Sequence, residues 1–327
     1  MAEVVKASDP SRCHWPALLR RWVVTPEAAG LWVFHELVIG ASPYVSFSNG
    51  PSAAEYGLPW LRWDVGFYAQ IARIGYPASR PYVAAYFPGV PAYLWIAHYP
   101  VVALLGMQVV VLALIVQVGR LASAWGLTGW RVALAQALVA LSPAAVFYST
   151  AYPEAWMALG LCGMLLAMQS QRPWAAAGWA AVAGVMDPLG LVMGLGAGVW
   201  ASVGAARRDW AAFRAGIAWG LGSVAALALV SGTLAVEIRR PFGFIGAQRA
   251  WGAHWLVPGV QIWQSLRNPL GLAAGARMAG LASLLVIIPG AFLVLRRIRG
   301  TSIWSAAVAG IAVACLLVPL AFYTPRG

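Results

Sequence analysis

Acidic residues are scarce in this sequence, so each of them is a candidate for chemistry. The chain of 327 residues holds 10 Asp and Glu against 22 Lys and Arg. Four of the ten are most simply surface charges: Glu3, Asp9, Glu27 and Asp209. The other six are Glu36, Glu55, Asp64, Glu154, Asp187 and Glu237. A carboxylate held in a partly apolar place can act as a general base, which is the chemistry these six suggest.

Asp64 is the strongest candidate among them. On a helix through residues 60–76, one apolar stripe would hold Trp60, Trp63, Phe67, Ile71 and Ile74, with Arg62 and Arg73 opposite. Asp64 falls about 40° from Trp60, at the edge of the stripe and far from both arginines. We therefore expect an unpaired carboxylate turned toward protein or membrane, with a raised pKa suited to deprotonating a hydroxyl. A helix-capping or structural Asp64 is the alternative.

Two further carboxylates have both a structural and a functional reading. Glu154 follows Pro153, and this pair suits a helix start, where the helix dipole favours a negative charge. Glu36 follows His35 inside an apolar stretch. An ionisable pair at membrane depth is a functional candidate, although the two groups could simply pair with one another.

Arginines gather in the segment that follows residue 235. Arg239, Arg240 and Arg249 lie near Gln248 and Trp251. Guanidinium groups bind phosphate well, so we interpret the three arginines as candidates for a lipid phosphate. The alternative is that they contact anionic lipid headgroups.

The composition indicates what must position these residues. Hydrophobic residues make up 61% of the chain and charged residues 10%, too few charges for a water-soluble domain of this length. Apolar runs long enough to cross a bilayer predict an all-α polytopic membrane protein with about nine spans. The expected spans are 28–47, 101–119, 132–149, 154–170, 173–187, 188–205, 213–235, 273–295 and 303–323.

Arg placement predicts the orientation of this single membrane domain, residues 1–327. With the N-terminus inside, every short inner loop carries Arg. Two long loops then lie outside, 48–100 and 236–272, provided that 83–99 is a helix lying in the interface. Five of the six candidate carboxylates fall on this outer side or at the outer ends of spans, and Glu36 lies inside the first span.

Several other classes of protein fit the sequence poorly. The net charge of +12 comes from 21 Arg and one Lys, without a basic helix suited to reading a nucleic-acid groove, so topology and anionic lipids explain it better. The three cysteines have no spacing typical of disulfide or zinc sites. No cleavable signal pattern is expected at the N-terminus. Abundant Ala and Arg with a single Lys indicate a GC-rich bacterial source.

Three segments of the sequence carry motif residues. The first is Arg62-Trp63-Asp64 with Gly75-Tyr76 and Tyr86-Phe87-Pro88. The second runs from Ser142-Pro143 to Tyr152-Pro153-Glu154, and the third runs from Phe244 through Gln248 to Trp251 and Pro258. In this order, and over about 200 residues, the three segments resemble the PIG-V family of mannosyltransferases, which is more specific than one motif.

The resemblance implies a GT-C glycosyltransferase fold and an inverting reaction. Asp64 would be the catalytic base, and Glu154, Gln248 and Trp251 would line the site, with the rings of Trp63, Tyr68 and Trp251 facing the sugar. The donor would be a polyprenyl-phosphate hexose, most simply mannose, and the acceptor a glycolipid or other hydroxyl compound. Such donors need no metal or other cofactor. The site would face the outside of a bacterial plasma membrane.

Two departures from the family pattern leave other functions open. Met186-Asp187-Pro188 stands where the family often has Thr-Arg-Pro, and the chain ends early for the family. A catalytically inactive relative is therefore an alternative. A lipid or solute transporter is another, since Glu36 and the Asp187-Pro188 break resemble features of transport sites.

Overall fold

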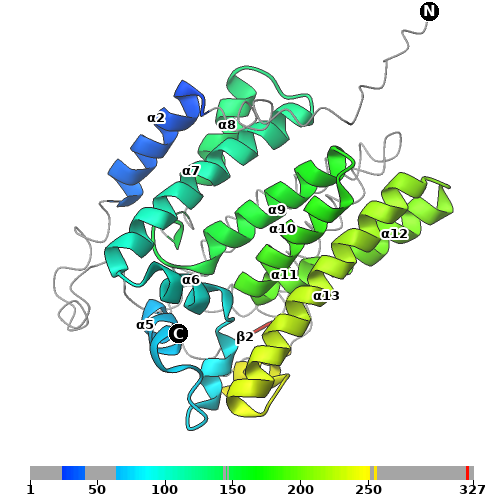
Figure 1. The fold of residues 1–327 in the computed structure, drawn as a ribbon. Coiled ribbons are helices and arrows are strands. Elements are labelled where there is room, and N and C mark those ends of the chain that lie inside the picture. Colours follow the sequence, from blue (N-terminus) through cyan, green and yellow to red (C-terminus); the bar gives the residue numbers. More distant parts are fainter. Residues whose placement is uncertain are drawn as a thin grey trace, which may run out of the picture.

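The computed structural model describes residues 24–40, 64–142, 145, 147–250, 254–255 and 322–323. Within these ranges every regular element is helical except one two-residue antiparallel ladder, in which His254–Trp255 pairs with Phe322–Tyr323. The helices pack side by side as a bundle, with a group of short helices at one end (Figure 1). The described part of the chain is therefore all-α, as the sequence predicts.

Three helical stretches are long and apolar enough to cross a membrane. They are α7 (Pro100–Ala124), α13 (Trp210–Ile238) and Pro188–Ala206, which joins α11 (Pro188–Met193) to α12 (Leu195–Ala206). Their length and composition support the membrane class. The expected span 273–295 lies outside the described residues, as does 303–323 except for its last two residues, so the number nine stays a prediction.

Shorter apolar helices complete the bundle. They are α2 (Pro26–His35), continued by the π-helix η2 (Glu36–Gly40), α8 (Trp130–Ala140), α9 (Pro153–Gln169) and α10 (Pro173–Met186). Several of these begin on a proline, whose fixed φ suits a first helical turn. The expected span 132–149 is too long, because α8 ends at Ala140. Pro143 in the sequence disfavours helical backbone at the preceding residue.

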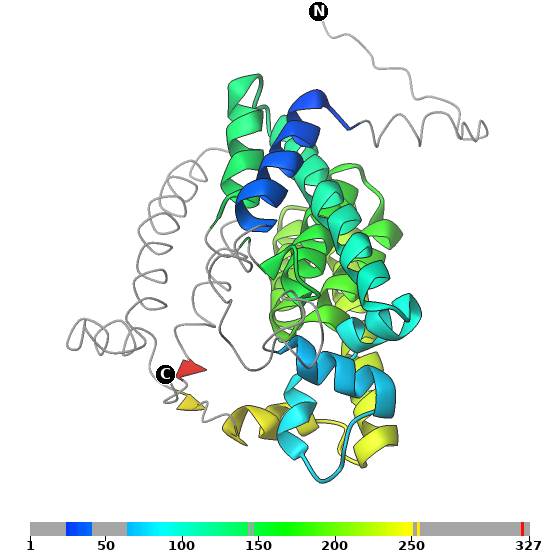
Figure 2. The same cartoon turned by 90° about the vertical axis from the view of Figure 1, so that its left-hand side faces the viewer.

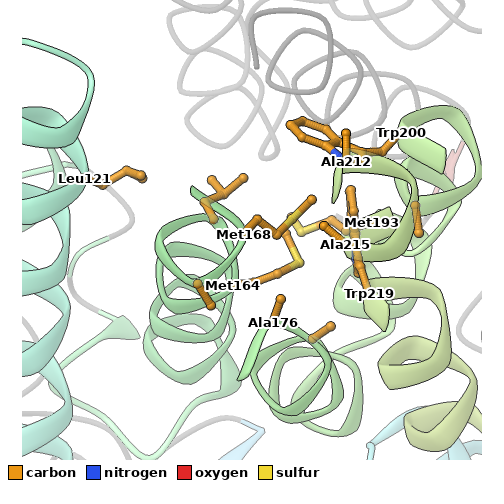
Figure 3. Packing of buried hydrophobic residues seen from close by; sticks show 13 residues of the cluster. Leu121, Met164, Met168, Ala176, Met193, Trp200, Ala212, Ala215 and Trp219 are labelled. Atoms are coloured by element: carbon orange, nitrogen blue, oxygen red, sulfur yellow. The ribbon is translucent and has the colours of Figure 1, made fainter. Parts of the chain in front are cut away.

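The core of the bundle lies between α9, α10, α12 and α13. Its buried cluster combines large and very small side chains, with Met164 and Met168 from α9 meeting Ala176 of α10 and Trp219 of α13 (Figure 3). The small residues allow close approach of backbones, which is how membrane helices associate. At the tightest point, a Cβ added to Gly222 of α13 would overlap the carbonyl oxygen of Ala177.

Short helices cover one end of the bundle (Figure 2). They are α5 (Val65–Ile74), the 3₁₀ helix η3 (Pro81–Ala85), α6 (Gly89–Ala97) and α14 (Gly243–Ala250). The interfacial helix expected over 83–99 is thus shorter, because the chain is extended at Tyr86 between η3 and α6.

The two long loops meet at this end of the bundle. Helix α14 of the second loop packs on η3 of the first, with Ala247 3% exposed and the rings of Phe87 and Phe244 5.5 Å apart, edge to face. The same buried cluster includes Tyr68 of α5 and Leu234 of α13. Two segments about 160 residues apart along the sequence therefore pack together as one unit.

Candidate active site

Asp64 lies immediately before α5, at the N-cap position. Its side chain makes no capping hydrogen bond; its backbone carbonyl accepts from the amides of Phe67 and Tyr68, which begin the helix. The carboxylate instead accepts a hydrogen bond from the hydroxyl of Tyr86, with 3.0 Å between the oxygens. The carboxylate thus has a hydrogen-bond partner that the sequence did not indicate, and the expectation of a capping side chain is wrong.

A second tyrosine fixes the backbone at the same point. The amide of Asp64 donates to the hydroxyl oxygen of Tyr152 at 3.1 Å. Tyr152 lies just before α9, whereas Tyr86 follows η3. Two segments distant in sequence thus hold Asp64, one through its carboxylate and one through its main chain.

Helix α5 is rotated relative to the expected stripe. Val65, Tyr68 and Ile71 are buried, whereas Ile74 is 68% exposed. The predicted apolar stripe was wrong because α5 does not lie alone on a membrane surface. It packs on α6 and on a buried cluster that includes residues of α13. Around the helix axis Asp64 falls between Ile71 and Tyr68, about 20° from one and about 40° from the other, so it belongs to the buried face rather than to its edge.

The environment of Asp64 favours its protonated form. The side chain is partly buried, and this desolvation raises the pKa of the carboxyl group above its ordinary value. The hydrogen bond from Tyr86 acts in the opposite direction and lowers the pKa. Desolvation is the larger effect, so Asp64 is a stronger base than an exposed aspartate, as the sequence predicts.

Aromatic rings surround the carboxylate. Tyr86 stacks on Phe67 with ring centroids 5.0 Å apart and meets Tyr68 edge to face at 5.1 Å. Tyr68 in turn lies 6.3 Å from Tyr152. These ring contacts limit the freedom of the two hydroxyls at Asp64.

Two more carboxylates, Glu154 and Asp187, lie close enough to Tyr68 to act on it electrostatically. Burial raises the pKa of Tyr68, and so do the negative charges of Asp187, Glu154 and Asp64, in that order. Tyr68 therefore lies within electrostatic reach of residues from three separate segments. These three carboxylates are therefore near one another in the structure, and the side of the membrane on which they lie stays a prediction.

Glu154 and Asp187 differ in how they are held. Glu154 is in the first turn of α9, and its Oε2 atom is buried without a hydrogen-bond partner. Asp187 separates α10 from α11, and its Oδ1 accepts from the amide of Leu189 at 2.7 Å, as a helix cap does. Glu154 consequently has a buried oxygen that is free to accept a hydrogen bond.

The structure locates the arginine candidates only in part. Arg239 ends α13 with left-handed backbone, φ 59°, and both Arg239 and Arg240 are exposed. Gln248 and Arg249 lie on α14, where the structure defines the helical backbone. Trp63 and Trp251 lie outside the described residues, so their expected contacts stay predictions.

Sequence reasoning missed the roles of Tyr86 and Tyr152. Both stand within the segments that carry the family resemblance, and that was the available signal. Within the part of the chain that the structure describes, no three His, Cys, Asp or Glu side chains are placed to hold one metal ion. The expectation of a metal-free site stays a prediction.

Comparison of the chain with protein-family models, curated proteins and solved structures gives no match. The fold and site define a helical protein of the membrane class with a buried acidic and tyrosine-rich centre under short end-capping helices. Its resemblance to the PIG-V family rests on the motif residues alone.

Proposed function

We propose that the protein is an inverting GT-C glycosyltransferase that moves a hexose, most simply mannose, from a polyprenyl-phosphate carrier to a hydroxyl acceptor. In the reaction, Asp64 takes the proton of the acceptor hydroxyl while its oxygen attacks the anomeric carbon. The bond from that carbon to the phosphate oxygen breaks, and polyprenyl phosphate leaves with the electron pair. One displacement inverts the anomeric centre.

The observation that carries this proposal is the hydrogen bond from Tyr86 to Asp64. A general base must be deprotonated, must have a pKa high enough to take the proton, and must be held within hydrogen-bond reach of it. Partial burial supplies the strength, and the Tyr86 hydroxyl at 3.0 Å from Oδ1 aims one oxygen and leaves the other for a substrate proton. The short helices over the ends of apolar spans suit a donor that carries its sugar on a membrane lipid.

Three further residues have proposed roles in binding. Glu154, with its buried unpartnered oxygen, would accept hydrogen bonds from sugar hydroxyls. Arg239 and Arg240, exposed at the end of α13, would bind the lipid phosphate and stabilise the charge that develops on it. We propose an extracytoplasmic site in a bacterial plasma membrane on the basis of Arg placement.

The test is transfer of labelled hexose by the full chain in vesicles. Polyprenyl-phosphate mannose should label a lipid or other acceptor, whereas a nucleotide-activated mannose should not when no lipid carrier is supplied. Equal transfer from the nucleotide sugar would contradict the proposed donor class. Transfer of a different hexose from the same lipid carrier would support the proposed donor class but would show that the sugar is not mannose.

The pH dependence of transfer should carry the signature of a desolvated base. Only the ionised form of Asp64 can accept a proton, so transfer should fall as the pH drops through the raised pKa of Asp64. We therefore expect the acidic limb of the rate–pH profile above the range typical of exposed aspartates. A profile flat down to the ordinary aspartate range would contradict the role of Asp64.

Replacing Tyr86 should shift that limb in a defined direction. The Tyr86 hydroxyl lowers the pKa of Asp64, so Tyr86→Phe should move the acidic limb to higher pH and lower the maximal rate by about 10-fold, a typical effect of losing one positioned hydrogen bond. Tyr82→Phe, which alters a nearby ring that meets Phe67 edge to face, is the matched control and should leave the limb in place. A shift to lower pH in Tyr86→Phe would contradict the geometry.

Transport is the second candidate function, and one observation favours it. Helices α10 and α11 are broken at Asp187, and broken helices often form solute sites. Movement of an unmodified lipid or solute across sealed vesicles, abolished by Asp187→Asn and unaffected by Asp64→Asn, would support this function over transfer.

A further inference from the structure

A second buried polar group lies apart from Asp64, where α2 passes into the π-helix η2. The Nε2 atom of His35 is 2.7 Å from the hydroxyl oxygen of Ser149, and this oxygen is 3.2 Å from Oε1 of Glu36. His35 is fully buried, and its Nε2 is 3.5 Å from the same Oε1. We call these three residues the His–Ser–Glu group. A π-helical turn often marks a functional position in a membrane or soluble helix.

The hydrogen bonds of this group fix how many protons it holds. Nδ1 of His35 is 2.6 Å from the carbonyl oxygen of Ala140, which can only accept, so Nδ1 carries a proton. Two hydrogen bonds then remain, from Nε2 to the hydroxyl oxygen and from that oxygen to Glu36. Ser149 supplies one proton for these two bonds. The second proton must lie on Nε2 or on the carboxyl group of Glu36.

Both placements of that proton satisfy every contact. With the proton on Nε2, His35 is an imidazolium that donates to Ser149, and Ser149 donates to an ionised Glu36. With the proton on Glu36, the acid donates to Ser149, and Ser149 donates to a neutral His35. The net charge of the group is zero either way, which suits an apolar surrounding. Without the proton, a carboxylate would face a nitrogen lone pair across 3.5 Å.

No other ionisable group completes or disturbs this arrangement within the described residues. Helices α7 and α8 pack on α2, and their charged residues are Arg120 and Arg131. Arg120 is 12 residues along α7 from Gln108, or about 18 Å, and Arg131 is nine residues from Ala140, or about 14 Å. Gln108 itself faces Glu36 and, with its amide nitrogen turned toward it, donates to Oε2 at 3.1 Å.

We propose that the His–Ser–Glu group is a proton-binding site that holds one proton beyond those of a neutral histidine, a serine and a carboxylate. The site joins two parts of the protein. Ser149 belongs to the segment between α8 and α9, which also carries Tyr152 to the amide of Asp64. A bound proton therefore links helix α2 to the segment that holds Asp64, and loss of the proton breaks one of the two hydrogen bonds to Ser149.

The proton count can be measured without any assay of activity. Full-length protein labelled with ¹⁵N only at histidine has four imidazoles, and His35→Gln identifies the signal of His35 by magnetic resonance in lipid vesicles. Infrared difference spectra of wild type against Glu36→Gln show whether Glu36 is a carboxylic acid or a carboxylate. Near neutral pH we expect either an imidazolium with a carboxylate or a neutral imidazole with a carboxylic acid.

Two results would overturn the proposal. A neutral His35 beside an ionised Glu36 means that the extra proton is absent, and a charged His35 beside a protonated Glu36 means that there are two. In Glu36→Gln, the amide can donate to Ser149 itself, so His35 should be neutral. Glu27→Gln, an exposed change at the start of the same helix, should leave the His35 signal of the wild type unchanged. A charged His35 in Glu36→Gln would also contradict the proposed chain of hydrogen bonds.

Discussion

Asp64→Asn should lower the rate of hexose transfer by about 100- to 10,000-fold, the usual range for loss of a positioned general base. The amide oxygen of asparagine can still accept from Tyr86, so the replacement removes basicity and keeps the contact at the site. Initial rates of label transfer at equal amounts of folded protein in vesicles measure the effect. Glu237→Gln is the matched control, because Glu237 is an exposed carboxylate beside Gly75 at the same end of the bundle. Its rate should equal that of the wild type.

The same replacement should make the protein more stable at neutral pH. The pKa of Asp64 is raised by burial in the folded state, so the unfolded chain releases its proton first and stability falls as pH rises through that interval. Asparagine has no such cost. Thermal unfolding in detergent should show a higher midpoint for Asp64→Asn near neutral pH and no difference at acid pH. A lower midpoint at neutral pH would mean that the lost transfer reflects damage to the fold.

The second large effect concerns folding rather than chemistry. Gly222→Ala should destabilise the protein by about 1–3 kcal/mol, the usual cost of overpacking a close-packed interior. The added methyl group would overlap the carbonyl oxygen of Ala177, which is backbone and cannot turn aside as a side chain can. Helices α10 and α13 would have to separate, and these two share the most extensive helix contact in the described structure. Thermal or denaturant unfolding measures the change.

Gly232→Ala is the control on the same helix. A Cβ at Gly232 meets no atom within 4 Å, so this change adds helix propensity without overlap. We expect an unchanged or slightly higher midpoint for Gly232→Ala and a clearly lower one for Gly222→Ala. Similar midpoints for the two variants would contradict the close approach of α10 and α13.

Much of the fold was predictable because apolar runs and prolines carry strong local information. The sequence predicts helix starts near 101, 154, 173 and 188, and the structure begins helices at Pro100, Pro153, Pro173 and Pro188. The end of α8 was predicted wrongly, since hydrophobicity alone does not show that Ser149 and Thr150 turn into the interior. The irregular segment between α8 and α9 makes the contacts to both Asp64 and Glu36, through Tyr152 and Ser149.

The sequence predicted the central residue of the candidate site, Asp64, but not the side chains that contact it. Asp64 stood out because it is a lone acid among aromatic and apolar neighbours. Its partners, Tyr86 and Tyr152, are 22 and 88 positions away, and no periodicity along one helix can show such contacts. The His35–Glu36 pair was open between function and mutual pairing, and the missing information was Ser149, which bridges them from 113 residues away in sequence.

Single-turnover transfer of radiolabelled mannose from polyprenyl phosphate tests the central claim most directly. The measurement compares purified wild type with Asp64→Asn in vesicles of one composition, with donor bound in both. The proposal predicts that label reaches the acceptor in the wild type, with inverted configuration, and remains on the donor in Asp64→Asn. Equal transfer by both proteins, or transfer that retains configuration, would contradict Asp64 as the base of a single displacement.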